Sequence, residues 1–91
     1  MQSSVVASNQ KRQAICSNLA RLLREERQRK NFSMNVLAAR SGISRQMVSY
    51  IEQEERNPTV DTLLRITEVL GVELDELIRK ARKAAGNSKS R

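Results

Sequence analysis

The feature that most limits how this chain can fold is the spacing of its apolar residues, which recur every three or four positions in short runs. Such spacing places apolar side chains on one face of an amphipathic α-helix and does not suit the strict alternation of a half-buried β-strand. Between the runs stand residues that end helices, namely Gly42, Pro58 and Gly71. The sequence therefore predicts short helices joined by short connections, and no strand.

Five helices are expected, at about residues 11–30, 34–40, 45–53, 60–70 and 74–84. Ser33, Ser44 and Thr59 each precede one of them, where a side-chain hydroxyl can accept a hydrogen bond from the first turn. The ends lack any periodicity. We therefore predict a flexible N-terminal extension at residues 1–10, one all-α domain at 11–84, and a flexible basic tail at 85–91.

The chain contains no histidine, and Cys16 is its single cysteine. A Ser/His or Cys/His nucleophile–base pair therefore cannot form, and neither can a disulfide within the chain. A transition-metal site would have to use carboxylates alone, which is unfavourable in a basic chain. We expect no enzyme activity, no cofactor and no metal ligand, and we expect Cys16 to be a small buried apolar residue.

No membrane-spanning or secretory segment is recognisable in the sequence. A run of the roughly 20 apolar residues needed to cross a bilayer is absent. The first residues, MQSSVVASNQKRQ, also lack the apolar core of a signal peptide. We expect a cytoplasmic protein without a membrane partner.

The formal net charge of +7 is unevenly distributed. The first third of the chain and residues 79–91 are basic, whereas residues 59–78 hold five acids against one arginine. Residues 32–58 are neutral, with three cations and three acids. Excess positive charge favours a polyanionic partner without naming one, and ordinary solvation explains the same pattern.

The neutral segment contains GISRQMVSYIEQ, residues 42–53. At about 100° per residue on a helix, Met47, Val48 and Ile51 share one side, and the opposite side carries Arg45, Gln46, Ser49, Tyr50 and Gln53. These five offer donors and acceptors with a single charge. Base edges in the major groove require such groups, because arginine pairs with guanine and glutamine with adenine. The alternative is an amide-rich surface face without function.

Residues 33–52, SMNVLAARSGISRQMVSYIE, resemble the helix-turn-helix of the phage repressor and Cro-type regulators, the XRE family. The matching positions are Leu37, Ala38, Gly42, Ile43, Val48 and Ile51. The resemblance extends from about residue 15 to residue 80 through RNPTVDTLLRITEVLGVELDEL. It implies a compact five-helix lambda repressor-like domain, with the motif in the second and third helices, that binds double-stranded DNA.

The resemblance also implies roles for particular residues. Base edges would be contacted by Arg45, Gln46, Ser49 and Tyr50, and a thymine methyl by Met47. Phosphates would be contacted by Ser44, where the helix N-terminus attracts anions, and by Arg56 and Asn57. Arg27 and Glu52 match an ion pair that ties the first helix to the third.

One position departs from the family pattern. Relatives usually carry glutamine at the start of the second helix, and this chain has Met34. A thioether is only a weak acceptor. Ser33 or Asn35 is therefore expected to make the phosphate contact in its place.

Regulators of this type bind pseudo-palindromic sites as dimers, with half-sites about one helical turn apart. The candidate dimer seam is the turn before the last helix and one side of that helix, namely Val72, Leu74, Leu77 and Ile78. The alternative is that these apolar residues close the core of a single chain.

The expected function is a sequence-specific transcriptional regulator of bacterial or phage origin, located in the cytoplasm and associated with the nucleoid. Its expected type is a restriction–modification controller or a phage-type repressor. Two alternatives stay open, an antitoxin that represses its own operon and a protein–protein adaptor that has lost DNA binding. RNA polymerase or a cognate toxin are the further partners that these types imply.

Overall fold

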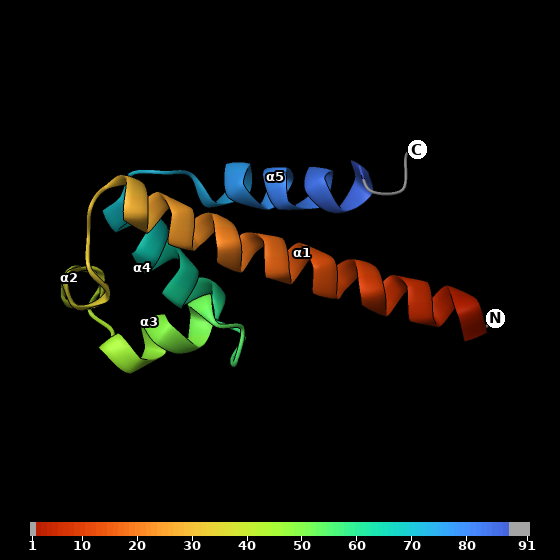
Figure 1. Cartoon of the computed structure of the whole chain (residues 1–91), viewed down its shortest axis with the longest axis horizontal. Coiled ribbons are helices and arrows are strands. Elements are labelled where there is room, and N and C mark those ends of the chain that lie inside the picture. The colour runs from red at the N-terminus through yellow and green to blue at the C-terminus, as the bar shows by residue number, and fades with distance from the viewer. Residues whose placement is uncertain (1, 88–91) are drawn as a thin grey trace.

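The computed structural model describes the backbone of residues 2–87 and the side chains of residues 9–86. Within that range the chain forms five helices and no strand (Figure 1). They are α1 (Gln2–Arg29), α2 (Met34–Ser41), α3 (Arg45–Glu52), α4 (Val60–Leu70) and α5 (Leu74–Asn87). The predicted all-α, five-helix architecture is confirmed.

The two terminal helices are longer than the sequence predicted. Helix α1 begins at Gln2 and not near Lys11, and α5 continues to Asn87. Residues 2–29 contain neither glycine nor proline, so a helix nucleated in the packed part can continue toward the N-terminus. Apolar periodicity marks only the stretch of a helix that packs against others. Met1 and residues 88–91, which belong to the predicted flexible ends, lie outside the described residues.

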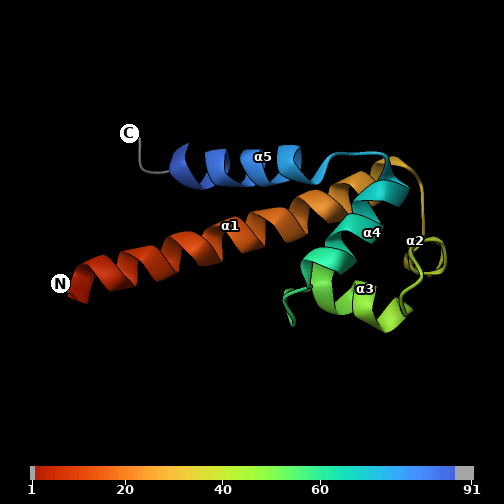
Figure 2. The same cartoon turned by 180° about the vertical axis from the view of Figure 1, so that it is seen from behind.

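Helices α1 and α5 pack side by side in opposite directions, and the N-terminal part of α1 projects beyond the other helices (Figures 1 and 2). The side-chain amide of Asn18 donates to the carbonyl oxygen of Ala81 at 3.0 Å and joins the two helices. Leu77 and Ala81 face this contact and are almost fully buried. None of the five helices is long and apolar enough, over the described residues, to cross a membrane.

The core lies between the C-terminal half of α1 and the helices α2 to α5. Its fully buried side chains include Leu37, Val48, Ile66 and Leu70. Because α3 contributes Val48 and Ile51 to this core, one side of that helix is fixed against the body. The opposite side of α3 is thereby turned outward.

Local signals in the sequence explain where the helices of the motif begin and end. The hydroxyls of Ser33 and Ser44 accept hydrogen bonds from the amides of Val36 and Met47, at 3.1 and 3.0 Å. Gly42 ends α2 with a φ of 74°, a conformation that costs glycine little. A Cβ atom at this position would also lie 3.1 Å from a guanidinium nitrogen of Arg65. Gly42 therefore satisfies both a backbone and a packing requirement.

Arg65 is held at this turn by a neighbour on its own helix. Its Nε donates to a carboxylate oxygen of Asp61 at 2.8 Å, and this hydrogen bond and the charge of Asp61 raise the pKa of Arg65.

Candidate nucleic-acid interface

Helix α3 divides its side chains between the core and the solvent much as the sequence predicted. Val48 and Ile51 expose 1% and 3% of their surface, whereas Arg45 and Gln46 are exposed and Ser49 and Tyr50 are half-buried. Met47 is half-buried and packs against the core. The structure thus brings four of the predicted base-reading residues to one outward face and leaves Met47 at its edge.

The predicted pair of Arg27 and Glu52 forms in the structure and fastens α3 to α1. Nε of Arg27 donates to one carboxylate oxygen of Glu52 at 2.7 Å, and a second guanidinium nitrogen donates to the other at 3.0 Å. A third nitrogen of Arg27 donates to the carbonyl oxygen of Phe32 at 2.8 Å. Both charged side chains are largely buried. This two-point contact sets the angle of α3 relative to α1.

Three polar residues of the outward face are joined to one another. The side-chain amide of Gln46 donates to the hydroxyl of Tyr50 at 2.7 Å, and the guanidinium of Arg56 lies over the Tyr50 ring, 4.9 Å from its centroid. The contact between Gln46 and Tyr50 was not predicted, although their i,i+4 spacing was a signal that could have indicated it. The position of Arg56 depends on the path of the loop after α3, which no sequence pattern specifies. We call these three residues the Tyr50 cluster.

The predicted phosphate contacts stand at the edges of this face. Ser44 lies at the N-terminus of α3, Ser33 and Asn35 lie at the N-terminus of α2, and Arg56 and Asn57 lie in the loop after α3; all five are exposed. The two serine hydroxyls already accept from backbone amides, and each retains its own hydrogen to donate. Met34 is half-buried against the core, so its side chain is used in packing.

A second cation–aromatic contact was not predicted from the sequence. The guanidinium of Arg40 lies over the ring of Phe32, 4.9 Å from its centroid. This contact joins α2 to the turn that precedes it. It adds a cation, fixed in place, on the helix that leads into the motif.

Cys16 is exposed, which contradicts the prediction that it is buried. It lines an open groove of about 530 Å³ between α1 and the loop that joins α3 to α4. Across this groove the hydroxyl of Ser17 donates to a carboxylate oxygen of Glu54 at 2.6 Å. Cys16 thus lies at this groove and does not belong to the core.

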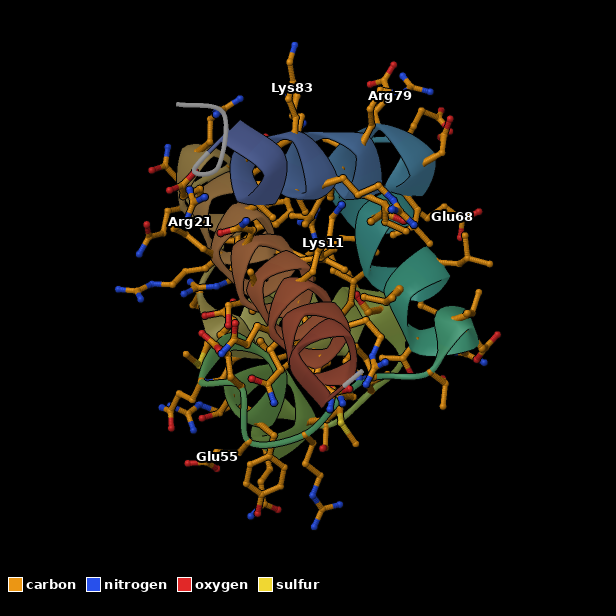
Figure 3. All side chains as sticks on the ribbon, turned by 90° about the vertical axis from the view of Figure 1, so that its right-hand side faces the viewer. Lys11, Arg21, Glu55, Glu68, Arg79 and Lys83 are labelled. Atoms are coloured by element: carbon orange, nitrogen blue, oxygen red, sulfur yellow. The ribbon has the colours of Figure 1, made fainter. Side chains whose placement is uncertain are left out.

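Helix α5 carries four cations. Figure 3 places Arg79 and Lys83 at one extreme and Glu55, which follows α3, at the other. The four cations of α5 are exposed, and none of them forms an ion pair within the described part of the chain. They are Arg79, Lys80, Arg82 and Lys83. Arg79 and Lys83 therefore do not belong to the surface that α3 presents.

The predicted dimer seam is only partly on the surface. Leu77 exposes 2% of its surface and belongs to the core of the single chain, as the alternative interpretation held. Val72, Leu74 and Ile78 are half-buried. Leu77 has therefore almost no surface left to offer to a second copy.

Comparisons with known proteins point to one class of regulator. A family model described as helix-turn-helix matches residues 23–77. The chain is 43% identical over 67 residues to an uncharacterized HTH-type transcriptional regulator, y4dJ, of Sinorhizobium fredii; the match covers 74% of this chain and 82% of that protein. It is 42% identical over 60 residues to the HTH-type transcriptional regulator SlrR of Bacillus subtilis, covering 65% of this chain and 40% of SlrR.

A third relative and two solved structures agree. The HTH-type transcriptional regulator SutR of Escherichia coli is 38% identical over 65 residues, with 36% of its length covered, so the chain spans less than half of SlrR and of SutR. A crystal structure of a mutant of the restriction-modification controller protein C.Esp1396I superposes with a TM-score of 0.69 at 26% identity, over 76% of this chain and 90% of that one. The clp gene regulator ClgR of Corynebacterium glutamicum shares the fold, with a TM-score of 0.73 at 20% identity, over 81% and 79% of the two chains.

Proposed function

This chain belongs to the helix-turn-helix family of DNA-binding transcriptional regulators, and on that premise we propose that it binds a pseudo-palindromic duplex operator as a homodimer. Helix α3 enters the major groove of each half-site. The roles of the individual residues are part of this proposal.

The observation that carries the proposal is the outward face of α3. It presents Arg45, Gln46, Ser49 and Tyr50 on a helix whose other side is buried. A surface helix selected only for solubility would carry lysine and glutamate there. Arginine and glutamine can each make two hydrogen bonds to one base, and such a pair discriminates by about 1–3 kcal/mol.

Contacts to phosphate complete the proposed interface. The free amides at the N-terminus of α3, together with the hydroxyl of Ser44, face an anion favourably because of the helix dipole. Ser33 and Asn35 act in the same way at α2, in place of the glutamine that Met34 replaces. Arg56 and Asn57 contact the backbone from the loop after α3. These contacts set the position of α3 on the duplex without reading its sequence.

Selection of bound fragments from a random duplex pool tests the proposal. We expect enrichment of two inverted half-sites whose centres lie about 10–10.5 base pairs apart. Affinity for the selected site should fall as salt rises, with a log–log slope of about −0.9 per neutralised phosphate. A pool from which no sequence is enriched would contradict the proposal and favour the adaptor alternative.

Dimerisation is proposed through the half-buried apolar edge formed by Val72, Leu74 and Ile78. Replacement Ile78→Glu should yield a single-copy mass in sedimentation, because a buried carboxylate without a partner is unfavourable. The matched control is Leu64→Glu on α4, where the native leucine is 51% exposed, and it should leave the dimer intact. If only the control dissociates the dimer, the interface lies on α4.

Among the types of regulator, we propose a restriction–modification controller or a phage-type repressor. The similarity to the controller protein C.Esp1396I, which extends over 90% of that chain, supports the controller type. Introduction of the selected operator upstream of a reporter gene distinguishes repression from activation. An antitoxin role would instead require a cognate toxin, which co-purification from the source cells would detect.

A further inference from the structure

The Tyr50 cluster links a candidate base-reading residue to a candidate phosphate-binding residue through one aromatic side chain. Gln46 and Tyr50 lie one turn apart on α3, and Arg56 comes from the loop after the helix. The hydrogen bond from Gln46 to Tyr50 is 2.7 Å long, and the guanidinium of Arg56 lies 4.9 Å from the ring centroid. Gln46 and Arg56 are exposed, whereas Tyr50 is half-buried.

The hydrogen bond leaves the amide of Gln46 with a defined pair of free groups. A glutamine amide has one carbonyl acceptor and two N–H donors. One N–H is used by the hydroxyl of Tyr50, so the carbonyl oxygen and the second N–H remain. Without this partner the terminal torsion of glutamine is broad, with two roughly equivalent orientations that exchange the oxygen and the nitrogen.

An adjacent acceptor and donor match one base in the major groove. Adenine presents an N6 donor beside an N7 acceptor, whereas guanine presents two acceptors, O6 and N7. The carbonyl oxygen of the oriented amide would meet an acceptor on guanine and a donor on adenine. The orientation of the amide in the free protein therefore already favours adenine over guanine, before the protein contacts DNA.

The ring of Tyr50 restrains Arg56 in a different manner. A guanidinium that stacks on an aromatic face is attracted by the negative charge of that face. Its N–H groups lie in the plane of the guanidinium and stay available for a phosphate. The ring thus restrains one cation of a loop that is otherwise exposed.

We infer that Tyr50 is a positioning residue, which orients the amide of Gln46 to select adenine at one base pair and holds Arg56 beside it for a neighbouring phosphate. This inference rests on the proposed DNA binding by α3. It replaces the expectation that Tyr50 itself reads a base.

Two substitutions at Tyr50 separate the two roles. Tyr50→Phe removes the hydroxyl and keeps the ring, so the preference for adenine at one base pair should fall about tenfold, which lies within the range of a bidentate contact. Binding to unrelated duplex and the salt slope should stay as in the native protein. Tyr50→Leu removes the ring as well, and the salt slope should then become shallower by about 0.9, the value of one phosphate.

A double substitution tests whether the hydroxyl acts through Gln46. In a Gln46→Ala background, Tyr50→Phe should cause no further loss of preference, because the amide that it orients is gone. A second, additive loss would assign the hydroxyl of Tyr50 a base contact of its own and would overturn the inference. An unchanged preference in the Tyr50→Phe variant alone would also overturn it.

The orientation of the amide is measurable in the free protein, without DNA. NMR relaxation of the Gln46 side-chain NH2 group should show restricted motion in the native protein and free motion in the Tyr50→Phe variant. Gln28 is the internal reference, since it is exposed and its amide makes no hydrogen bond within the described residues. Equal mobility of the Gln46 and Gln28 amides would contradict the inference.

The outcomes distinguish this inference from the proposed function. Failure of the native protein to select any duplex sequence would contradict the proposed function. Selection by the native protein together with an unchanged Tyr50→Phe variant would contradict only the role assigned to Tyr50.

Discussion

Helices α3 and α5 each bury one side against the body and expose the other, yet the chemistry of the two exposed faces differs. The face of α3 offers amide and hydroxyl groups with the single cation Arg45. The exposed residues of α5 begin with two acids, Asp75 and Glu76, and continue with four cations that form no ion pair with any residue the structure describes. The cations Arg79 and Lys83 thus lie away from the helix that is proposed to read bases.

The difference between the two faces separates two tasks, discrimination between bases and attraction to the DNA backbone. The composition of the chain does not distinguish them. Discrimination between bases requires directed hydrogen bonds, whereas attraction to the backbone requires only positive charge. A positively charged face attracts the DNA backbone whatever its base sequence. A nearly neutral face on α3 is therefore consistent with sequence-specific binding. The acids Asp75 and Glu76 in the first turn of α5 also complement the helix dipole.

The two helices are also attached to α1 by different means. Helix α3 is held by the buried pair of Arg27 and Glu52, whereas α5 is held by apolar packing of Leu77 and Ala81 and one hydrogen bond from Asn18. Removal of one charge of the buried pair should therefore weaken the attachment of α3 more than any surface substitution weakens the attachment of α5. The predictions below test this contrast.

The largest expected effect is that of Glu52→Leu, which leaves the guanidinium of Arg27 buried without its partner. We expect the free energy of unfolding to fall by about 3–5 kcal/mol in urea denaturation. The double variant Arg27→Met with Glu52→Leu should recover most of this loss, because neither charge remains. Equal losses in the single and double variants would show that packing and not charge anchors α3.

Arg45→Ala tests the specificity of the outward face of α3. We expect a loss of about 1–3 kcal/mol in binding and a relaxed preference at one base pair. Affinity should be measured on duplexes that carry each of the four base pairs at that position. A uniform loss on all four would mean that Arg45 contacts the backbone and not a base.

Ser44→Ala should weaken α3 at its N-terminus. Removal of the hydroxyl leaves the amide of Met47 without its acceptor and should lower the free energy of unfolding by about 1 kcal/mol. Thermal denaturation measures this loss, and Ser44→Asn, which retains a cap, is the control. If Ser44 serves only as a helix cap, the folded Ser44→Ala variant should bind the operator with native affinity.

The smallest effect is expected on α5. The double substitution Arg82→Gln with Lys83→Gln should change stability by no more than about 0.5 kcal/mol, as is usual for exposed positions. Operator affinity should also stay close to native, because both side chains are exposed on α5 and Lys83 lies on the side opposite Glu55, which follows α3. A salt slope that becomes shallower by about 0.9 per removed cation would show instead that α5 contacts phosphate.

Much of the motif follows from local chemistry. Ser33, Ser44 and Gly42 act on their own neighbouring backbone, so a single sequence suffices to place them. The outward face of α3 also follows from the sequence, since the angle at which a side chain leaves a helix is set by its residue number. These features need no knowledge of the rest of the fold.

Other features required the three-dimensional arrangement. The apolar pattern of α5 suits a core and a dimer seam equally well, and only the path of α1 assigns Leu77 to the core. Cys16 fits the apolar pattern of α1, but it is exposed at the groove between α1 and the loop after α3. The place of Arg56 on Tyr50 depends on the loop after α3.

The sequence by itself determined the helical class, the helix-turn-helix and the outward residues of α3, because periodicity and capping act within a few residues. Only the tertiary structure decided that Arg56, from the loop after α3, lies over the ring of Tyr50. It also placed Arg79 and Lys83 of α5 on the side opposite α3. Such relations arise where separate elements pack together, and packing depends on the whole chain.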